Sequence, residues 1–176
     1  MAGSTPDEAV RAFVGPIQDI LKCFLKGKVT TDSSDPAKPG ILTLNRAEPV
    51  QVFGEDKLQI LLQMNYLILN QPDQDEPWKV STTGWIYHLL DRNGARLLGY
   101  HWHPLSALSP ITEPHVHVQP RNHHLPTGRI LIEDVLFASV EYGAEPRDRA
   151  EWLQIDAANR ELFAGEATWG AGTRPV

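Results

Sequence analysis

The sequence predicts an α+β fold: an antiparallel sheet with an N-terminal helix and two C-terminal helices packed on one face. Residues 58–69 alternate between a wholly apolar face and a mixed face, as in a long, partly covered strand. Asn93-Gly94 stands between two apolar runs, which is a strong signal for a tight hairpin. Apolar residues recur at helical spacing near both ends of the chain. The 176 residues suit a single domain, 1–176.

The first 28 residues are predicted to form a helix. Thr5-Pro6-Asp7-Glu8 has the form of a capping box with proline at the first helical position. Pro16 predicts a kink or a restart within this helix. Residues 29–40 are rich in Pro, Ser and Asp and predict a polar loop, and short strands are expected at 41–44 and 49–53.

The hairpin turn sets the register of the strands on either side of it. With Asn93 and Gly94 as a two-residue loop, Leu90 pairs with Leu97 and the pairing continues outward to Trp85 and Trp102. Because side chains alternate along a strand, the residues separate into two faces. One face carries Trp85, Tyr87, Leu89, Leu98, Tyr100 and Trp102, and the other carries Ile86, His88, Leu97, Gly99, His101 and His103.

A second histidine pair follows the hairpin. His115 and His117 are two residues apart, so both point the same way if the segment is a strand. If that strand pairs beside the arm that holds His101 and His103, four histidines share one surface. His123 and His124 are adjacent, so a strand directs them to opposite sides, and we expect His124 to join the site.

The segment 121–129 is rich in hydrogen-bond donors and leads into a predicted helix whose apolar stripe includes Val135 and Leu136. Backbone N–H groups at the helix start, with Arg129 beside them, favour an anion such as phosphate. The alternative is that Thr127 only caps the helix and that Arg129 meets solvent or Glu133. Pro146 is expected to open the last helix, and the Gly-rich tail 165–176 to be ordered only in part.

Composition limits the class of function. The formal net charge is −6, which argues against a non-specific DNA coat. A single cysteine, Cys23, excludes an internal disulfide and is compatible with a reducing compartment. No signal peptide or membrane-length apolar run is evident, so we expect a cytoplasmic protein without membrane contact.

Clustered histidines suit two chemistries, and both remain open at this point. Neutral imidazoles ligate transition metals such as zinc; the expected ligands are His88, His101, His103, His115 and His117. Histidines also act as general base and acid in phosphodiester cleavage of RNA; the expected catalytic residues are His101, His103, His115 and His117, with His124, Arg121 and Arg129 binding the substrate. Otherwise the chain is a non-enzymatic metal-binding or protein-interaction domain, or these histidines are ordinary sheet residues.

Two resemblances to known families bear on the choice between these functions. The arrangement around Asp91-Arg92-Asn93-Gly94, Tyr100-His101-Trp102-His103 and Pro114-His115-Val116-His117 resembles bacterial toxins of the TumE type, over roughly residues 80–120. That resemblance implies a ribonuclease-like toxin that acts on RNA and has an antitoxin protein as partner. The run His124-Leu125-Pro126-Thr127-Gly128-Arg129 is also similar to a pattern in uncharacterised bacterial proteins.

His115-Val116-His117-Val118-Gln119 is similar to the His-x-His-x-Gln motif of the histidine-triad superfamily. This second resemblance implies a nucleotide hydrolase or transferase in which His117 is the nucleophile on phosphorus. We place this expectation below the toxin hypothesis.

Overall fold

The computed structural model describes residues 1–104, 111–119 and 123–166, and within them nine strands form one antiparallel sheet. Seven strands follow in the order β2-β3-β5-β6-β7-β8-β9, while β1 pairs with β6 and β4 with β5. The strands are β1 (Ala2–Gly3), β2 (Val29–Thr31), β3 (Gly40–Leu44), β4 (Val50–Gln51), β5 (Gln59–Asn70), β6 (Trp78–Leu90), β7 (Arg96–Trp102), β8 (His115–Val118) and β9 (His123–Pro126). The helices are α1 (Pro6–Lys22), α2 (Ile132–Glu141) and α3 (Arg149–Glu166), with a short 3-10 helix η1 (Asn45–Ala47).

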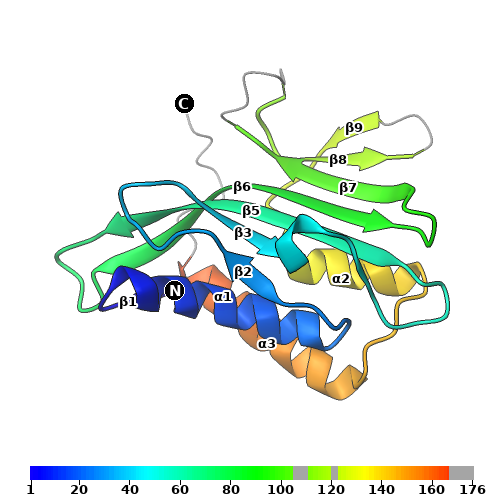
Figure 1. The fold of residues 1–176 in the computed structure, drawn as a ribbon, viewed down its shortest axis with the longest axis horizontal. Helices are drawn as coiled ribbons and strands as arrows, with labels where there is room; N and C mark the ends of the chain where they lie inside the picture. The colour runs from blue at the N-terminus through cyan, green and yellow to red at the C-terminus, as the bar shows by residue number, and fades with distance from the viewer. Residues whose placement is uncertain (105–110, 120–122, 167–176) are drawn as a thin grey trace.

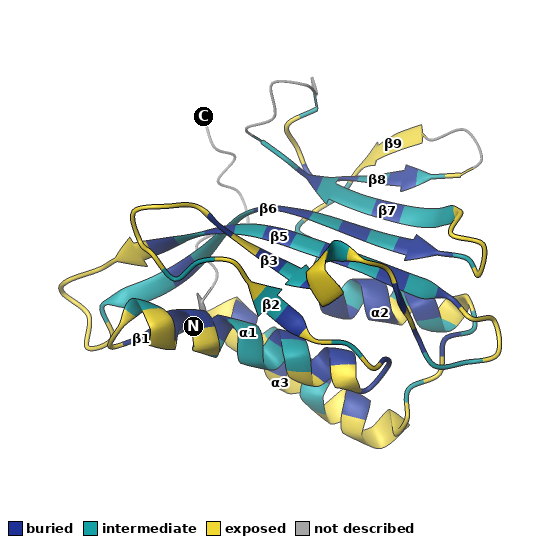
Figure 2. Ribbon diagram, viewed as in Figure 1, coloured by how far each residue is buried: buried dark blue, intermediate teal, exposed yellow. Residues whose placement is uncertain are grey.

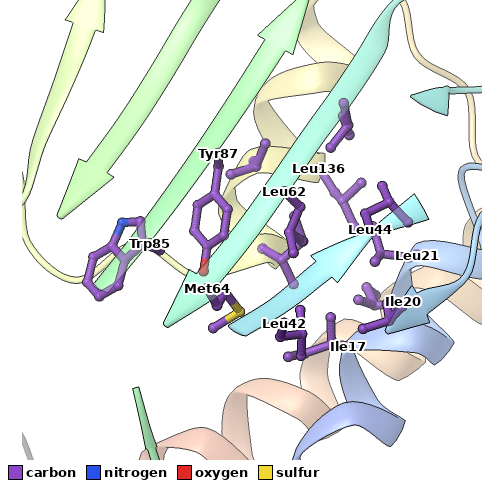
Figure 3. Close-up of a cluster of buried hydrophobic side chains, with 14 of the residues drawn as sticks. Ile17, Ile20, Leu21, Leu42, Leu44, Leu62, Met64, Trp85, Tyr87 and Leu136 are labelled. Carbon is purple, nitrogen blue, oxygen red and sulfur yellow. The ribbon is translucent and has the colours of Figure 1, made fainter. Parts of the chain in front are cut away.

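The three α-helices lie on the same side of the sheet, which confirms the predicted α+β arrangement (Figure 1). The core is the apolar layer between the three helices and the central strands, and Figure 3 shows a cluster of its buried side chains. Leu62 is fully buried there, and burying such a side chain contributes about 1.5–3 kcal/mol. The helices cover one face of the sheet, and every second residue of the central strands points to the opposite face.

Helix α1 begins at the predicted capping box. The Thr5 hydroxyl accepts from the Glu8 backbone N–H at 3.2 Å, and the Glu8 carboxylate accepts from the Thr5 N–H at 3.2 Å. The helix continues through Pro16 and ends at Lys22, so the expected restart and the extension to residue 28 are wrong. The buried apolar side chains of α1 pack against the sheet, and this packing stabilises the helix by more than the loss of the backbone hydrogen bond at Pro16 destabilises it.

Strand β5 alternates as predicted, with Ile60, Leu62 and Met64 buried toward the helices. It pairs along its whole length with β6, where the register shifts between Asn65 and Tyr66. Residues of β5 alternate between half-buried and buried from Gln59 to Ile68 (Figure 2), whereas β6 alternates less regularly.

The β6–β7 hairpin has the predicted register from Trp85–Trp102 to Leu89–Leu98, but its turn differs. Among its loop residues only Gly94 has a positive φ, at 82°, so the two-residue turn is wrong. The Asp91 carboxylate accepts from the N–H groups of Asn93 and Ala95, and the loop has three residues. Leu90 then pairs with Arg96 rather than Leu97, and the bulge at Leu97 restores the predicted register beyond it.

Other helices and strands begin or end at residues different from the predicted ones, because helix caps and strand partners outweigh the local sequence pattern. Part of the predicted loop 29–40 is β2, which pairs with β3. Helix α3 begins after Asp148, whose carboxylate accepts from the Ala150 and Glu151 N–H groups, rather than at Pro146. Helix α2 begins at Ile132, so Thr127 is not its cap; the Asp134 carboxylate instead accepts from the Leu131 N–H at 2.8 Å. Residues 167–176 of the predicted tail lie outside the described residues.

Across the described part of the chain, no helix combines the length and apolarity needed to cross a membrane.

Candidate metal centre

Strand pairing brings histidines from four strands to the sheet face opposite the helices. His101 of β7 stands opposite His115 of β8, which confirms the expected pairing of these segments. His117 stands opposite Gly99 on one side and opposite His124 of β9 on the other. Because directly opposed residues share a face, these histidines lie on one surface. The aromatic residues of the same strands, Trp85 and Tyr87 among them, are buried on the helix side.

The imidazole rings are in contact across the strands. The ring centroids of His101 and His117 are 4.3 Å apart, and those of His103 and His115 are 5.2 Å apart. The ring centroid of His124 lies 4.0 Å from that of His117 and 5.2 Å from that of His115, on which the His124 ring stacks. The four histidines predicted to share a surface therefore do so, and His124 joins them.

Hydrogen bonds determine which ring nitrogens can bind a metal. The Nδ1 atom of His115 lies 2.8 Å from the Glu113 carbonyl oxygen. Since a carbonyl only accepts, this Nδ1 carries the proton and donates, which leaves Nε2 as the ligand atom. His88 Nε2 lies 2.8 Å from His101 Nε2, so one of these two rings orients the other. His103 Nδ1 is buried and has no hydrogen-bond partner among the described residues.

Two groups of three histidines have the geometry of a metal centre. In the first, His101, His103 and His115 each offer a ring nitrogen, and these atoms lie within 4.8 Å of one another; the same holds for His115, His117 and His124 in the second. Nitrogens that bind one tetrahedral zinc ion at about 2.0–2.1 Å lie roughly 3.4 Å apart, so any pair of nitrogens that is farther apart would have to move closer by rotation of the rings. The groups share His115, which has one free lone pair and can bind only one ion at a time.

The environment keeps several of these rings neutral. Burial, followed by the nearby Arg96 and His117, lowers the pKa of His88 to about 4. Burial, followed mainly by the neighbouring histidines, lowers the pKa of His101 to about 3. Burial also lowers the pKa of His115, partly offset by its bond to the Glu113 carbonyl. Neutral imidazole is the form that ligates a metal, and lowered pKa values disfavour the imidazolium form that acts as a general acid near pH 7.

Arg129, one of the two arginines proposed to bind substrate, is not brought to this cluster. Arg129 lies on the helix side of the sheet, beside Tyr87 and Glu133 in the pocket under α2, where burial lowers its pKa. Arg121 lies outside the described residues. The exposed His124 reaches the cluster from β9, which is exposed along its whole length (Figure 2).

Sequence reasoning missed Arg96. The predicted two-residue turn assigned it to the aromatic face, but the bulge at Leu97 makes Arg96 the partner of Leu90, on the histidine face. The signal was present: aspartate three residues before glycine, in Asp91-Arg92-Asn93-Gly94, is typical of a type I turn followed by a left-handed glycine.

No protein-family model, curated protein or solved structure matches this chain. Inferences about function therefore depend on the geometry and chemistry of the histidine cluster.

Proposed function

We propose that the protein binds one divalent transition-metal ion, of the zinc class, through the histidine cluster. The observation that carries the proposal is that three imidazole nitrogens, in either of two groups sharing His115, lie within 4.8 Å of one another. Neither group contains a carboxylate or a thiolate. Such a nitrogen-only set suits Zn²⁺, Ni²⁺ or Cu²⁺ and disfavours Mg²⁺ and Ca²⁺, which prefer oxygen ligands.

Three histidine ligands leave one coordination position open, which distinguishes catalytic zinc sites from structural ones. When bound, such an ion supplies a Lewis acid that polarises a substrate oxygen or a water molecule. In the first group, the buried His115 and the half-buried His101 and His103 would hold the ion at the sheet face, and His88 would orient His101 through their hydrogen bond. Hydrolysis of a phosphodiester such as RNA is the reaction we propose for this centre.

Metal-free cleavage of RNA, with histidines alone as base and acid, is the weaker candidate. That reaction needs a protonated imidazole near neutral pH. Burial lowers the pKa of His88 to about 4 and that of His101 to about 3, which disfavours those two rings as the general acid at pH 7.

The first experiment measures metal binding. Chelator-stripped protein is titrated with Zn²⁺ by calorimetry and with Co²⁺ by absorption spectroscopy, and we expect one ion per chain. His115→Ala removes the ligand that both groups share and should abolish tight binding. His123→Ala is the matched control, because His123 is adjacent to His124 but points to the opposite side of β9. Equal binding by wild type and His115→Ala would contradict the proposal.

The second experiment separates the two reactions. RNA is incubated with the protein in the presence and absence of chelator, beside His101→Ala and His117→Ala. Metal-dependent hydrolysis predicts cleavage that chelator abolishes and added Zn²⁺ restores. Cleavage that survives the chelator and disappears in both variants would instead support metal-free catalysis. Tight metal binding without cleavage would support the non-enzymatic metal-binding domain.

A further inference from the structure

Arg96 lies across the histidine face beside His88, in a space that Gly99 leaves open. A Cβ atom on Gly99 would be 2.9 Å from Arg96 Cδ and 3.3 Å from Arg96 Nε. The same Cβ would be 3.2 Å from His88 Cδ2. Arg96 and His88 therefore both reach the position that a side chain at residue 99 would occupy. The Nε atom of Arg96 is buried, so its guanidinium begins inside this surface rather than in solvent.

The charge of this surface is positive once a metal ion is present. Neutral imidazoles cancel none of the ion's two charges, and no carboxylate belongs to either histidine group among the described residues. The positive charge of Arg96 also acts on the nearby His88 and His101. A guanidinium has five N–H donors in a planar fork, so a contact on one side leaves donors for another. Such an arrangement attracts an anion to the open coordination position.

We infer that the metal-loaded cluster binds an oxyanion of the phosphate or phosphate-ester class, with one oxygen on the metal and Arg96 holding a second. This inference rests on the proposed metal centre and names the anion-binding residue of that site. Arginine matches the geometry of a phosphate through two parallel N–H···O bonds, which a lysine ammonium does not reproduce. Gly99 contributes by leaving room for the Arg96 side chain.

The test uses the full chain loaded with Co²⁺, titrated with inorganic phosphate and followed by absorption and by calorimetry. Arg96→Met removes the charge while keeping a long side chain over Gly99. We expect it to bind Co²⁺ at least as tightly as wild type, because a neighbouring positive charge is gone. Its phosphate affinity should fall by about tenfold or more, as expected for losing a charge-assisted hydrogen bond. Arg96→Lys should recover only part of that affinity.

Arg92→Met is the matched control: it makes the same change in net charge, four residues away in the exposed hairpin loop. It should leave phosphate affinity unchanged. The inference is overturned if phosphate does not bind the Co²⁺ protein, or if Arg96→Met and Arg92→Met bind it equally well; the metal centre would survive either result. Failure of the wild type to bind Co²⁺ or Zn²⁺ would remove the metal centre itself. Urea unfolding of each variant establishes that the fold is intact.

Discussion

Replacing Gly99 with alanine tests whether Arg96 and His88 fill the space above this residue. Gly99 is buried, and it is not among the glycines with positive φ, so alanine fits the backbone. The added Cβ would be 2.9 Å from Arg96 Cδ and 3.2 Å from His88 Cδ2. Arg96 must therefore move, and His88 must shift against its 2.8 Å bond to His101.

Two effects of the change oppose one another. Alanine reduces the conformational freedom of the unfolded chain, which stabilises a protein by about 0.4–1 kcal/mol where the backbone is compatible. Inserting a methyl group into filled space costs about 1–3 kcal/mol. Gly128→Ala isolates the first effect, because a Cβ there meets nothing within 4 Å and its φ is not positive. The difference between the two variants therefore measures the steric cost alone.

The assay is urea unfolding of both variants and wild type, in the absence of metal. We expect Gly128→Ala to be slightly more stable than wild type and Gly99→Ala to be less stable than Gly128→Ala by at least about 1 kcal/mol. In a chain of this size that difference is roughly 2–4 °C in Tm. If both variants are stabilised equally, the space above Gly99 is empty and the role assigned to Arg96 is refuted.

Three further predictions concern the fold and the pH response. Thr5→Ala removes one half of the capping box and should lower the free energy of unfolding by about 1 kcal/mol, while Thr5→Ser should retain most of it. Leu62→Ala empties a fully buried position and should cost about 2–5 kcal/mol in the same urea assay; a cost below 1 kcal/mol would contradict the packing described. The folded-state pKa values of His88 (about 4) and His101 (about 3) lie below the ordinary value of 6.5, so the unfolded chain binds protons first as pH falls. The metal-free protein should therefore lose stability from about pH 6.5 down to about pH 3, and the decline in Tm should be smaller in His88→Asn; identical profiles would count against the buried, neutral His88.

Much of the architecture followed from local pattern. The capping box at Thr5, the alternation of residues 58–69 and the outer register of the hairpin each depend on residues close together in sequence. The convergence of His101 and His115 was predictable once both segments were taken as strands, because side-chain parity along a strand is fixed. Hydrophobic burial then left only one register that placed the aromatic residues inside.

The errors arose where competing local signals were nearly balanced. The Asn93-Gly94 pair suits a two-residue turn, but the Asp91 carboxylate stabilises a three-residue loop by accepting two backbone N–H groups. Pro146 and Thr127 were plausible helix starts, yet Asp148 and Asp134 supply the hydrogen bonds at the actual ones. These differences amount to about 1 kcal/mol each, less than what tertiary packing contributes.

Local sequence was enough to predict which residues share a sheet face, because alternation along a strand is a property of the backbone. The folded chain places Arg129 on the helix side of the sheet and Arg96 on the histidine face. For Arg96 the cause is the bulged residue Leu97, because one extra residue reverses which face of the strand the side chains beyond it point to. The place of the bulge depends on how the turn, the neighbouring strands and the core fit together.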